Sequence, residues 1–152
     1  MAEVSRTANV SWEGDLAKGG GEVELASSHA AGPLPVSFPS RAAERAGGQT
    51  SPEELIAAAH ASCYAMSLSG LLARGGNAPE SLAVSAEVTI EKPPSGGIEI
   101  TSSDLRVRGH VPGLDPAAFD RAARDAEEAC PVSNALRGNL EITVEAELEG
   151  EA

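Results

Sequence analysis

The sequence contains two cysteines, whose thiols are its most reactive candidate groups. Cys63 lies in the middle of an apolar stretch, and Cys130 lies directly before a proline. A cysteine reacts as a nucleophile through its thiolate, and a nearby cation or a helix N-terminus favours that form. His60 precedes Cys63 by three residues, so the two side chains share one face of a helix. The sequence therefore allows a reactive Cys–His pair, with two inert cysteines as the alternative.

The other candidate residues leave several roles open. Cys63, His60 and Cys130 have the side chains of a Cys₂His zinc site, but no C-x-x-C spacing or nearby carboxylate ligand supports one. A single histidine on an apolar helix is typical of a hydrogen-bonded core or interface residue. Glu53 and Glu54 are explained as partners of the positive end of a helix dipole. Residue types alone therefore do not choose between a catalytic and a structural role.

The residues around Cys63 predict one long helix over 52–74. Ser51 and Glu54 have the spacing of a capping box at its start. The stretch 55–73 contains no Asp, Glu, Lys or Arg, but it is too rich in Ala and too often interrupted by Ser, His and Gly for a convincing membrane span. A helix that is apolar on every face is usually buried on every face, so this one requires cover on two sides.

The remaining segments predict six strands, a second helix and a short third one. Alternating apolar and polar residues predict strands over 4–12, 22–25, 34–39, 82–91, 98–111 and 140–148. A helix over 116–129 has an expected buried stripe of Phe119, Ala122, Ala123, Ala126 and Ala129. This order predicts a single domain over 1–152 of the α+β class, with mainly antiparallel sheets packed around the long central helix.

Two connections in this scheme hold candidate site residues. The segment 40–49 is expected to be a polar loop, and it contains Arg41 and Arg45. Pro131 breaks the second helix and opens another helical turn, which makes Cys130 the cap of that turn. The first connection therefore places Arg41 just after a predicted strand, and the second places Cys130 at the start of a helical turn.

Composition and charge limit the partners. Hydrophobic residues make up 41% of the chain and charged residues 22%, and the net charge is −12. This charge argues against a nucleic-acid partner and against binding to an anionic membrane. The N-terminus lacks a basic start followed by an apolar run, so we expect a cytoplasmic protein. The uncovered side of the long helix is most simply covered by a second copy of the chain, which predicts a homodimer.

Two segments resemble the signature segments of the OsmC/Ohr proteins, which are thiol-dependent peroxidases of bacteria. They are TSPEELIAAAHASC over 50–63 and CPVS over 130–133. The early SWEGD over 11–15 and the last strand are similar to the OsmC branch, so the resemblance covers nearly the whole chain. It implies an OsmC-like fold in an intertwined homodimer.

The resemblance also implies site residues. Cys63 matches the peroxidatic cysteine, Cys130 the resolving cysteine and Glu53 the catalytic glutamate. Arg41 is the best match to the family's arginine in the loop before the helix, and Arg45 is its rival. Glu53 and Cys63 are ten residues apart, which is about 15 Å along one helix. If both serve one site, Glu53 and its arginine must therefore act on the thiol of the other subunit.

The implied activity is that of a peroxiredoxin-type enzyme of the oxidative stress response. Organic hydroperoxides, and more weakly hydrogen peroxide, would be reduced through a Cys63 sulfenic acid and a Cys63–Cys130 disulfide. A dithiol or lipoyl-type reductant would restore the thiols, with no metal or other cofactor. The alternative is a non-enzymatic dimer that senses redox state or binds an apolar ligand.

Overall fold

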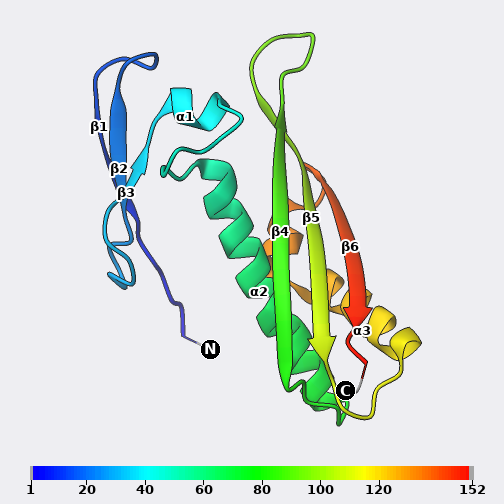
Figure 1. Ribbon diagram of the computed structural model, residues 1–152. Helices are drawn as coiled ribbons and strands as arrows, with labels where there is room; N and C mark the ends of the chain where they lie inside the picture. Colours follow the sequence, from blue (N-terminus) through cyan, green and yellow to red (C-terminus); the bar gives the residue numbers. More distant parts are fainter. Residues whose placement is uncertain (1, 151–152) are drawn as a thin grey trace. The chain divides into compact units, whose positions relative to one another are not determined.

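A computed structural model describes residues 2–150, and the chain divides into two compact units, Met1–Pro52 and Glu53–Ala152 (Figure 1). The first unit contains one sheet and a short helix. The second contains most of the long helix, a second sheet and two further helices. The class is α+β, as the sequence predicts.

The sheet of the first unit is antiparallel, with its strands in chain order. Its members are β1 (Asn9–Glu13), β2 (Gly20–Glu24) and β3 (Leu34–Val36). The first strand is shorter than expected, because only residues from Asn9 onward pair with β2. Trp12 of β1 is 42% exposed, and its indole N–H donates to the carbonyl of Gly14 at 2.9 Å.

A short helix follows this sheet where the sequence predicts a strand end and a loop. Helix α1 (Phe38–Ala42) begins after Ser37, whose hydroxyl accepts a hydrogen bond from the backbone N–H of Ser40 at 3.2 Å. Pro39, in its first turn, suits a helix start. Arg41 therefore lies on a helix and not in an irregular loop, which corrects the expectation.

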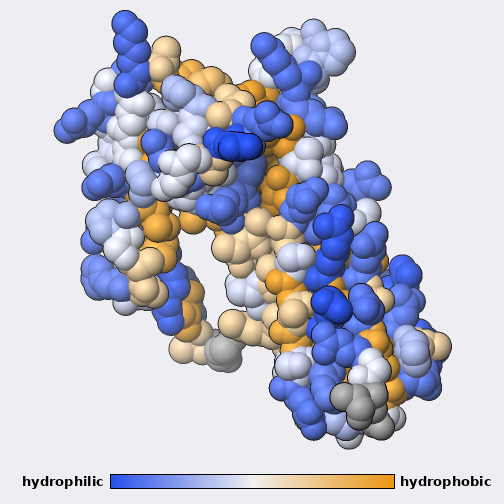
Figure 2. All heavy atoms as spheres, in the orientation of Figure 1, coloured by the Kyte–Doolittle hydropathy of each residue, from blue (hydrophilic) through white to orange (hydrophobic). Residues whose placement is uncertain are grey.

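Helix α2 (Pro52–Arg74) has the bounds that the sequence predicts. Its buried residues after the first turn are His60, Tyr64, Leu68 and Leu72, which recur every four positions and form one stripe. The other faces are not buried by this chain, and Met66 is 74% exposed. Figure 2 shows apolar residues, in orange tones, at the surface along α2. By length and composition α2 could also cross a membrane, a test that the core helix of a soluble protein passes too.

The second sheet has the order β4–β5–β6 and is mixed. Strands β4 (Ser81–Glu91) and β5 (Glu99–His110) form an antiparallel pair. Strand β6 (Glu141–Leu148) is parallel to β5, which departs from the antiparallel expectation at this one pair. The reason is the connection: two helices lie between β5 and β6 and return the chain to the starting end of β5.

These two helices are α3 (Pro116–Ala129) and α4 (Pro131–Leu136). Asp115 caps α3 by accepting the backbone N–H of Ala118 at 2.8 Å. The buried stripe of α3 contains four of the five expected residues, whereas Ala129 is exposed. The position four residues after the buried Ala126 is Cys130, which is fully buried. The stripe therefore ends on the cysteine.

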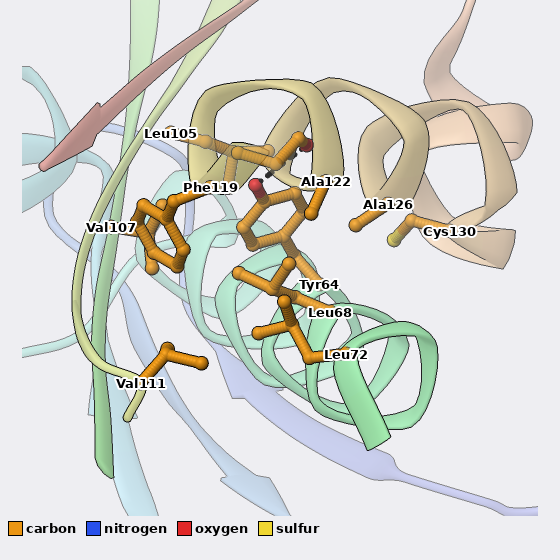
Figure 3. Close-up of a cluster of buried hydrophobic side chains, with 11 residues drawn as sticks. Tyr64, Leu68, Leu72, Leu105, Val107, Val111, Phe119, Ala122, Ala126 and Cys130 are labelled. Atoms are coloured by element: carbon orange, nitrogen blue, oxygen red, sulfur yellow. Dashed lines mark hydrogen bonds between the residues drawn. The ribbon is translucent and has the colours of Figure 1, made fainter. Parts of the chain in front are cut away.

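Helices α2 and α3 bury one face of this sheet. Leu105 and Val107 of β5 are fully buried against Tyr64 and Leu68 of α2 and Phe119 of α3 (Figure 3). Figure 3 also places the sulfur of Cys130 beside Ala126 at the margin of this cluster. The hydrophobic core of the second unit therefore extends to the resolving-cysteine candidate.

Candidate active site

Cys63 lies in the middle of α2, next to the buried stripe, and its side chain is partly exposed. The next residue, Tyr64, is fully buried, and its hydroxyl donates to the carbonyl of Ala123 in α3 at 2.8 Å. Burial raises the pKa of Tyr64, so its hydroxyl stays a donor. This bond fixes the rotation of α2 and directs Cys63 toward the connection between α3 and α4.

Cys130 forms that connection. Its backbone is extended, with φ −70° and ψ 118°, because the following Pro131 disfavours a helical residue before it. The side chain is fully buried. As the N-cap of α4, its sulfur accepts a hydrogen bond from the backbone N–H of Ser133 at 3.5 Å. The predicted capping role of Cys130 is confirmed.

The two thiols lie side by side, and both are free cysteines. Burial raises the pKa of the Cys63 thiol, a hydrogen bond from the backbone amide of Val132 lowers it, and the adjacent Cys130 thiol raises it again. The net shift is upward. Without a further positive group, Cys63 is therefore a protonated thiol at neutral pH.

His60 is fully buried and bridges two elements through both ring nitrogens. Its Nδ1 lies 2.6 Å from the hydroxyl oxygen of Ser103 in β5, and its Nε2 lies 2.7 Å from that of Ser133 in α4. Burial lowers the pKa of His60, and the carboxylate of Glu127 raises it in opposition. The net shift is downward, so the ring is neutral at pH 7, with one nitrogen donating and the other accepting.

These contacts confirm the prediction of a hydrogen-bonded core histidine and decide against the two alternatives for His60. The imidazole bonds to serines, so the geometry does not give Cys63 a histidine base. Both ring nitrogens are occupied, which leaves neither for a zinc ion shared with the cysteines. Among residues 2–150, no group of three His, Cys, Asp or Glu side chains is placed to hold a metal ion.

An ion pair holds the far end of α4 to the end of α3. Nη2 of Arg137 lies 2.9 Å from a carboxylate oxygen of Glu127, and the same atom donates to the backbone carbonyl of Glu127 at 3.3 Å. It also donates to the side-chain oxygen of Asn134 at 3.2 Å. The side chain of Glu127 is only 12% exposed, so this pair is better shielded from water than a surface ion pair.

Glu53 lies in the first turn of α2 and is 7% exposed. It is on the same helix as Cys63, ten residues away, which corresponds to about 15 Å. One chain therefore does not bring its own Glu53 against its own Cys63. A carboxylate buried to this degree needs partners, and Glu53 does interact with other groups of the protein.

Arg41 belongs to the first unit, whereas Glu53, Cys63 and Cys130 belong to the second. A small cavity of about 140 Å³ adjoins Arg41. It is lined mainly by apolar side chains: Trp12, Leu16, Val36, Phe38 and Pro52. Arg45 is exposed and does not line this cavity. The first unit thus offers a guanidinium beside an apolar surface.

Sequence reasoning identified the two cysteines but missed the residues that hold them. Ser103, Ser133 and Arg137 were not singled out, because serine and arginine are frequent and each reaches its partner only through the fold. The CPVS segment was a usable signal for Ser133, since it is the third residue after Cys130 and therefore in the first turn of α4.

Known proteins resemble this chain in sequence and in structure. The family described as OsmC-like protein matches residues 45–145. Peroxiredoxin OsmC of Escherichia coli is 38% identical over 138 residues, which are 91% of this chain and 92% of that protein. The organic hydroperoxide resistance protein of Xanthomonas axonopodis pv. citri is 33% identical over 130 residues, 84% of this chain and 88% of that protein.

Solved structures agree with the sequence comparisons. An organic hydroperoxide resistance protein OsmC from Legionella pneumophila superposes with a TM-score of 0.72 at 25% identity, covering 97% of this chain and 99% of that one. An organic hydroperoxide resistance protein from Elizabethkingia anophelis has a TM-score of 0.75 at 23% identity, covers 98% of this chain and 100% of that one, and shows the shared fold.

The fold is that of a small α+β protein in which two free cysteines lie near each other. The chain belongs to the OsmC family of proteins, as the matched residues and both curated relatives show.

Proposed function

We propose that this protein is a thiol-dependent peroxidase that reduces organic hydroperoxides to alcohols. The observation that carries the proposal is the proximity of the Cys63 and Cys130 thiols, which come from different elements of one unit. A partly exposed thiol beside a buried one suits a two-cysteine cycle, in which the first meets the oxidant and the second closes the disulfide.

The raised pKa of Cys63 supports a requirement for a cation. In the proposed site the guanidinium of Arg41, oriented by Glu53, stabilises the thiolate and polarises the peroxide. Because Glu53 is ten residues from Cys63 on the same helix, these two groups act on Cys63 of the other subunit. Two copies of α2 running antiparallel across a two-fold axis would give two such shared sites.

The exposed faces of α2 support this homodimer. Met66 is 74% exposed, and the buried stripe covers one side of the helix only. A large apolar surface of this kind marks an interaction site on a soluble protein. A second copy would cover it and would also supply the arginine and the glutamate.

The proposed cycle has three steps. The Cys63 thiolate attacks the terminal peroxide oxygen, the O–O bond breaks, and the leaving alkoxide takes a proton to become the alcohol. The sulfur of Cys130 then attacks the Cys63 sulfenic acid, and hydroxide leaves with the Cys130 proton as water. A dithiol or lipoyl-type reductant finally reduces the Cys63–Cys130 disulfide and becomes a disulfide itself.

Two findings support an organic substrate over hydrogen peroxide. The cavity beside Arg41 is lined mainly by apolar side chains and holds about 140 Å³, and an alkyl tail gains free energy on burial there, whereas hydrogen peroxide has none. The relatives are named peroxiredoxin and organic hydroperoxide resistance protein, which supports a hydroperoxide-related redox role for this chain.

The test is peroxide consumption with dithiothreitol or dihydrolipoamide as the reductant. Wild-type protein and Cys63→Ser are compared with cumene hydroperoxide and with hydrogen peroxide. We expect multiple turnovers for the wild type, faster with cumene hydroperoxide, and none above background for the variant. Equal consumption by Cys63→Ser would refute the assignment, and a single oxidation without turnover would favour a redox sensor.

A further inference from the structure

The sulfur of Cys130 and the amide that contacts Cys63 are both held by the first turn of α4. The backbone N–H of Ser133 donates to Cys130 at 3.5 Å, and the adjacent amide of Val132 bonds to the sulfur of Cys63. Any shift of this turn therefore moves both donors together. The position of α4 decides how the two sulfur atoms face each other.

Helix α4 has six residues, too few to be stable by itself. Its C-terminal end is held by the Arg137–Glu127 ion pair at 2.9 Å. Its first turn is held by the hydroxyl of Ser133, which lies 2.7 Å from Nε2 of His60. This second contact is fully buried at both residues, so water cannot replace it.

His60 is itself fixed in place by Ser103. The 2.6 Å contact to Nδ1 orients the ring, so that Nε2 is presented to Ser133. The imidazole thus connects β5, through α2, to the helix that begins at Cys130. The catalytic cycle proposed above does not use this residue, although it lies one turn from Cys63.

We propose that Ser133, held by His60, is a positioning residue for the step in which Cys130 attacks the Cys63 sulfenic acid. The inference rests on the proposed peroxidase function. In that step the S–S bond forms as the S–O bond of Cys63 breaks, so the attacking sulfur must lie in line with that bond. Ser133 keeps it there, because its side chain is anchored while its backbone N–H holds the sulfur of Cys130.

The fold supplies a matched control. Ser133 and Ser103 are both fully buried serines bonded to the same imidazole, but only Ser133 belongs to the helix that holds the sulfur atoms. Ser133→Ala and Ser103→Ala each remove one hydroxyl from the same cluster. A general loss of core stability would affect both variants alike.

The experiment is single-turnover oxidation of the full-length protein with cumene hydroperoxide, followed by rapid quenching and mass spectrometry. We expect Ser133→Ala to slow disulfide formation about tenfold, which corresponds to one buried hydrogen bond. Formation of the sulfenic acid should change by less than about threefold. With excess peroxide, the sulfenic acid of this variant persists longer and should be oxidised further to sulfinic acid. Ser103→Ala should slow disulfide formation clearly less than Ser133→Ala does, because Ser103 acts on Ser133 only through His60 and lies outside α4.

The possible outcomes separate this inference from the proposed function. If the wild type is not oxidised at Cys63, the peroxidase function fails, and this inference fails with it. If the wild type forms the disulfide and Ser133→Ala does so at the same rate, only the positioning role is refuted. An equal slowing in both serine variants would likewise refute it, since the effect would then come from the core as a whole.

Discussion

The thiols of Cys63 and Cys130 are near neighbours that influence each other's protonation, although one lies in the middle of a long helix and the other at the break between two helices. Cys130 is fully buried, whereas Cys63 is partly exposed. The proposed disulfide would therefore join two groups that already lie near each other in the reduced protein.

The difference in exposure predicts selective alkylation. N-ethylmaleimide added to the reduced native protein should label Cys63 and leave Cys130 unlabelled, because the reagent does not reach a fully buried sulfur. In denaturant both should react. Peptide mapping by mass spectrometry measures this, and native labelling of Cys130 at the rate of Cys63 would contradict the described burial.

Replacing Arg41 should raise the pKa of Cys63 further. Burial and the Cys130 thiol already raise it, so loss of the guanidinium that we propose beside it would remove the main support for the thiolate. We expect Arg41→Met to shift the pH profile of iodoacetamide alkylation upward by about one unit or more. Arg45→Met is the control and should leave the profile unchanged. The opposite result would assign the role to Arg45.

The proposed sharing of each site between two subunits predicts complementation between two inactive variants. In a mixed dimer of Cys63→Ser and Glu53→Gln chains, one site combines an intact Cys63 with an intact Glu53 of the other subunit. That dimer should regain about half of the wild-type peroxidase activity, because one of its two sites is complete. Differently tagged chains, co-expressed and purified through both tags, provide the sample.

Homodimers of either variant, purified in the same way, are the controls and should remain inactive. A mixed dimer with no activity would show that Glu53 and Cys63 do not act across the subunit boundary.

The burial of His60 predicts that the free energy of unfolding depends on pH. Its folded pKa lies below the ordinary value of 6.5 because the ring is buried, so below about pH 6.5 the unfolded chain binds a proton that the folded chain does not. The free energy of unfolding should therefore fall as the pH decreases, by up to about 1.4 kcal/mol per pH unit from this residue.

Urea unfolding measured between about pH 7 and pH 5.5, above the main carboxylate range, tests this. His60→Gln should lower stability at pH 7 but show a weaker pH dependence than the wild type. His29→Asn changes an exposed histidine with a positive φ of 51°, a conformation that Asn tolerates, and should keep the wild-type dependence. Equal slopes in all three proteins would contradict a buried neutral His60.

Adding a side chain at Gly109 of β5 should disturb the packing of the core. A Cβ at this position would lie 2.6 Å from Cζ of Phe119 and 3.1 Å from a methyl carbon of Leu82. Phe119 is only 1% exposed, so other core side chains enclose its ring. Gly109→Ala should therefore destabilise the protein by about 1–3 kcal/mol in urea unfolding. Gly150→Ala, where nothing lies within 4 Å, should be neutral.

Local sequence signals were sufficient for most elements. The charge-free stretch after Ser51 predicted α2 with its observed bounds, and the prolines at 116 and 131 marked the starts of α3 and α4. These signals act within a few residues, through capping, periodicity and the fixed φ of proline. The same local reasoning failed at α1, whose five residues are too few to show a helical period.

The direction of β6 could not be read from its own residues. Alternation of apolar and polar side chains is the same in a parallel and an antiparallel strand. The pairing with β5 depends on how α3 and α4 return the chain, which is a property of the whole unit. The sequence therefore predicted the strand but not its orientation.

The sequence by itself determined that two cysteines occupy a long helix and a helix start, because helix caps and proline breaks are local. Only the tertiary structure decided that these two thiols are neighbours and that His60 bonds two serines. These partners are far apart along the chain, and burial of one continuous apolar cluster from α2, α3 and β5 brings them together.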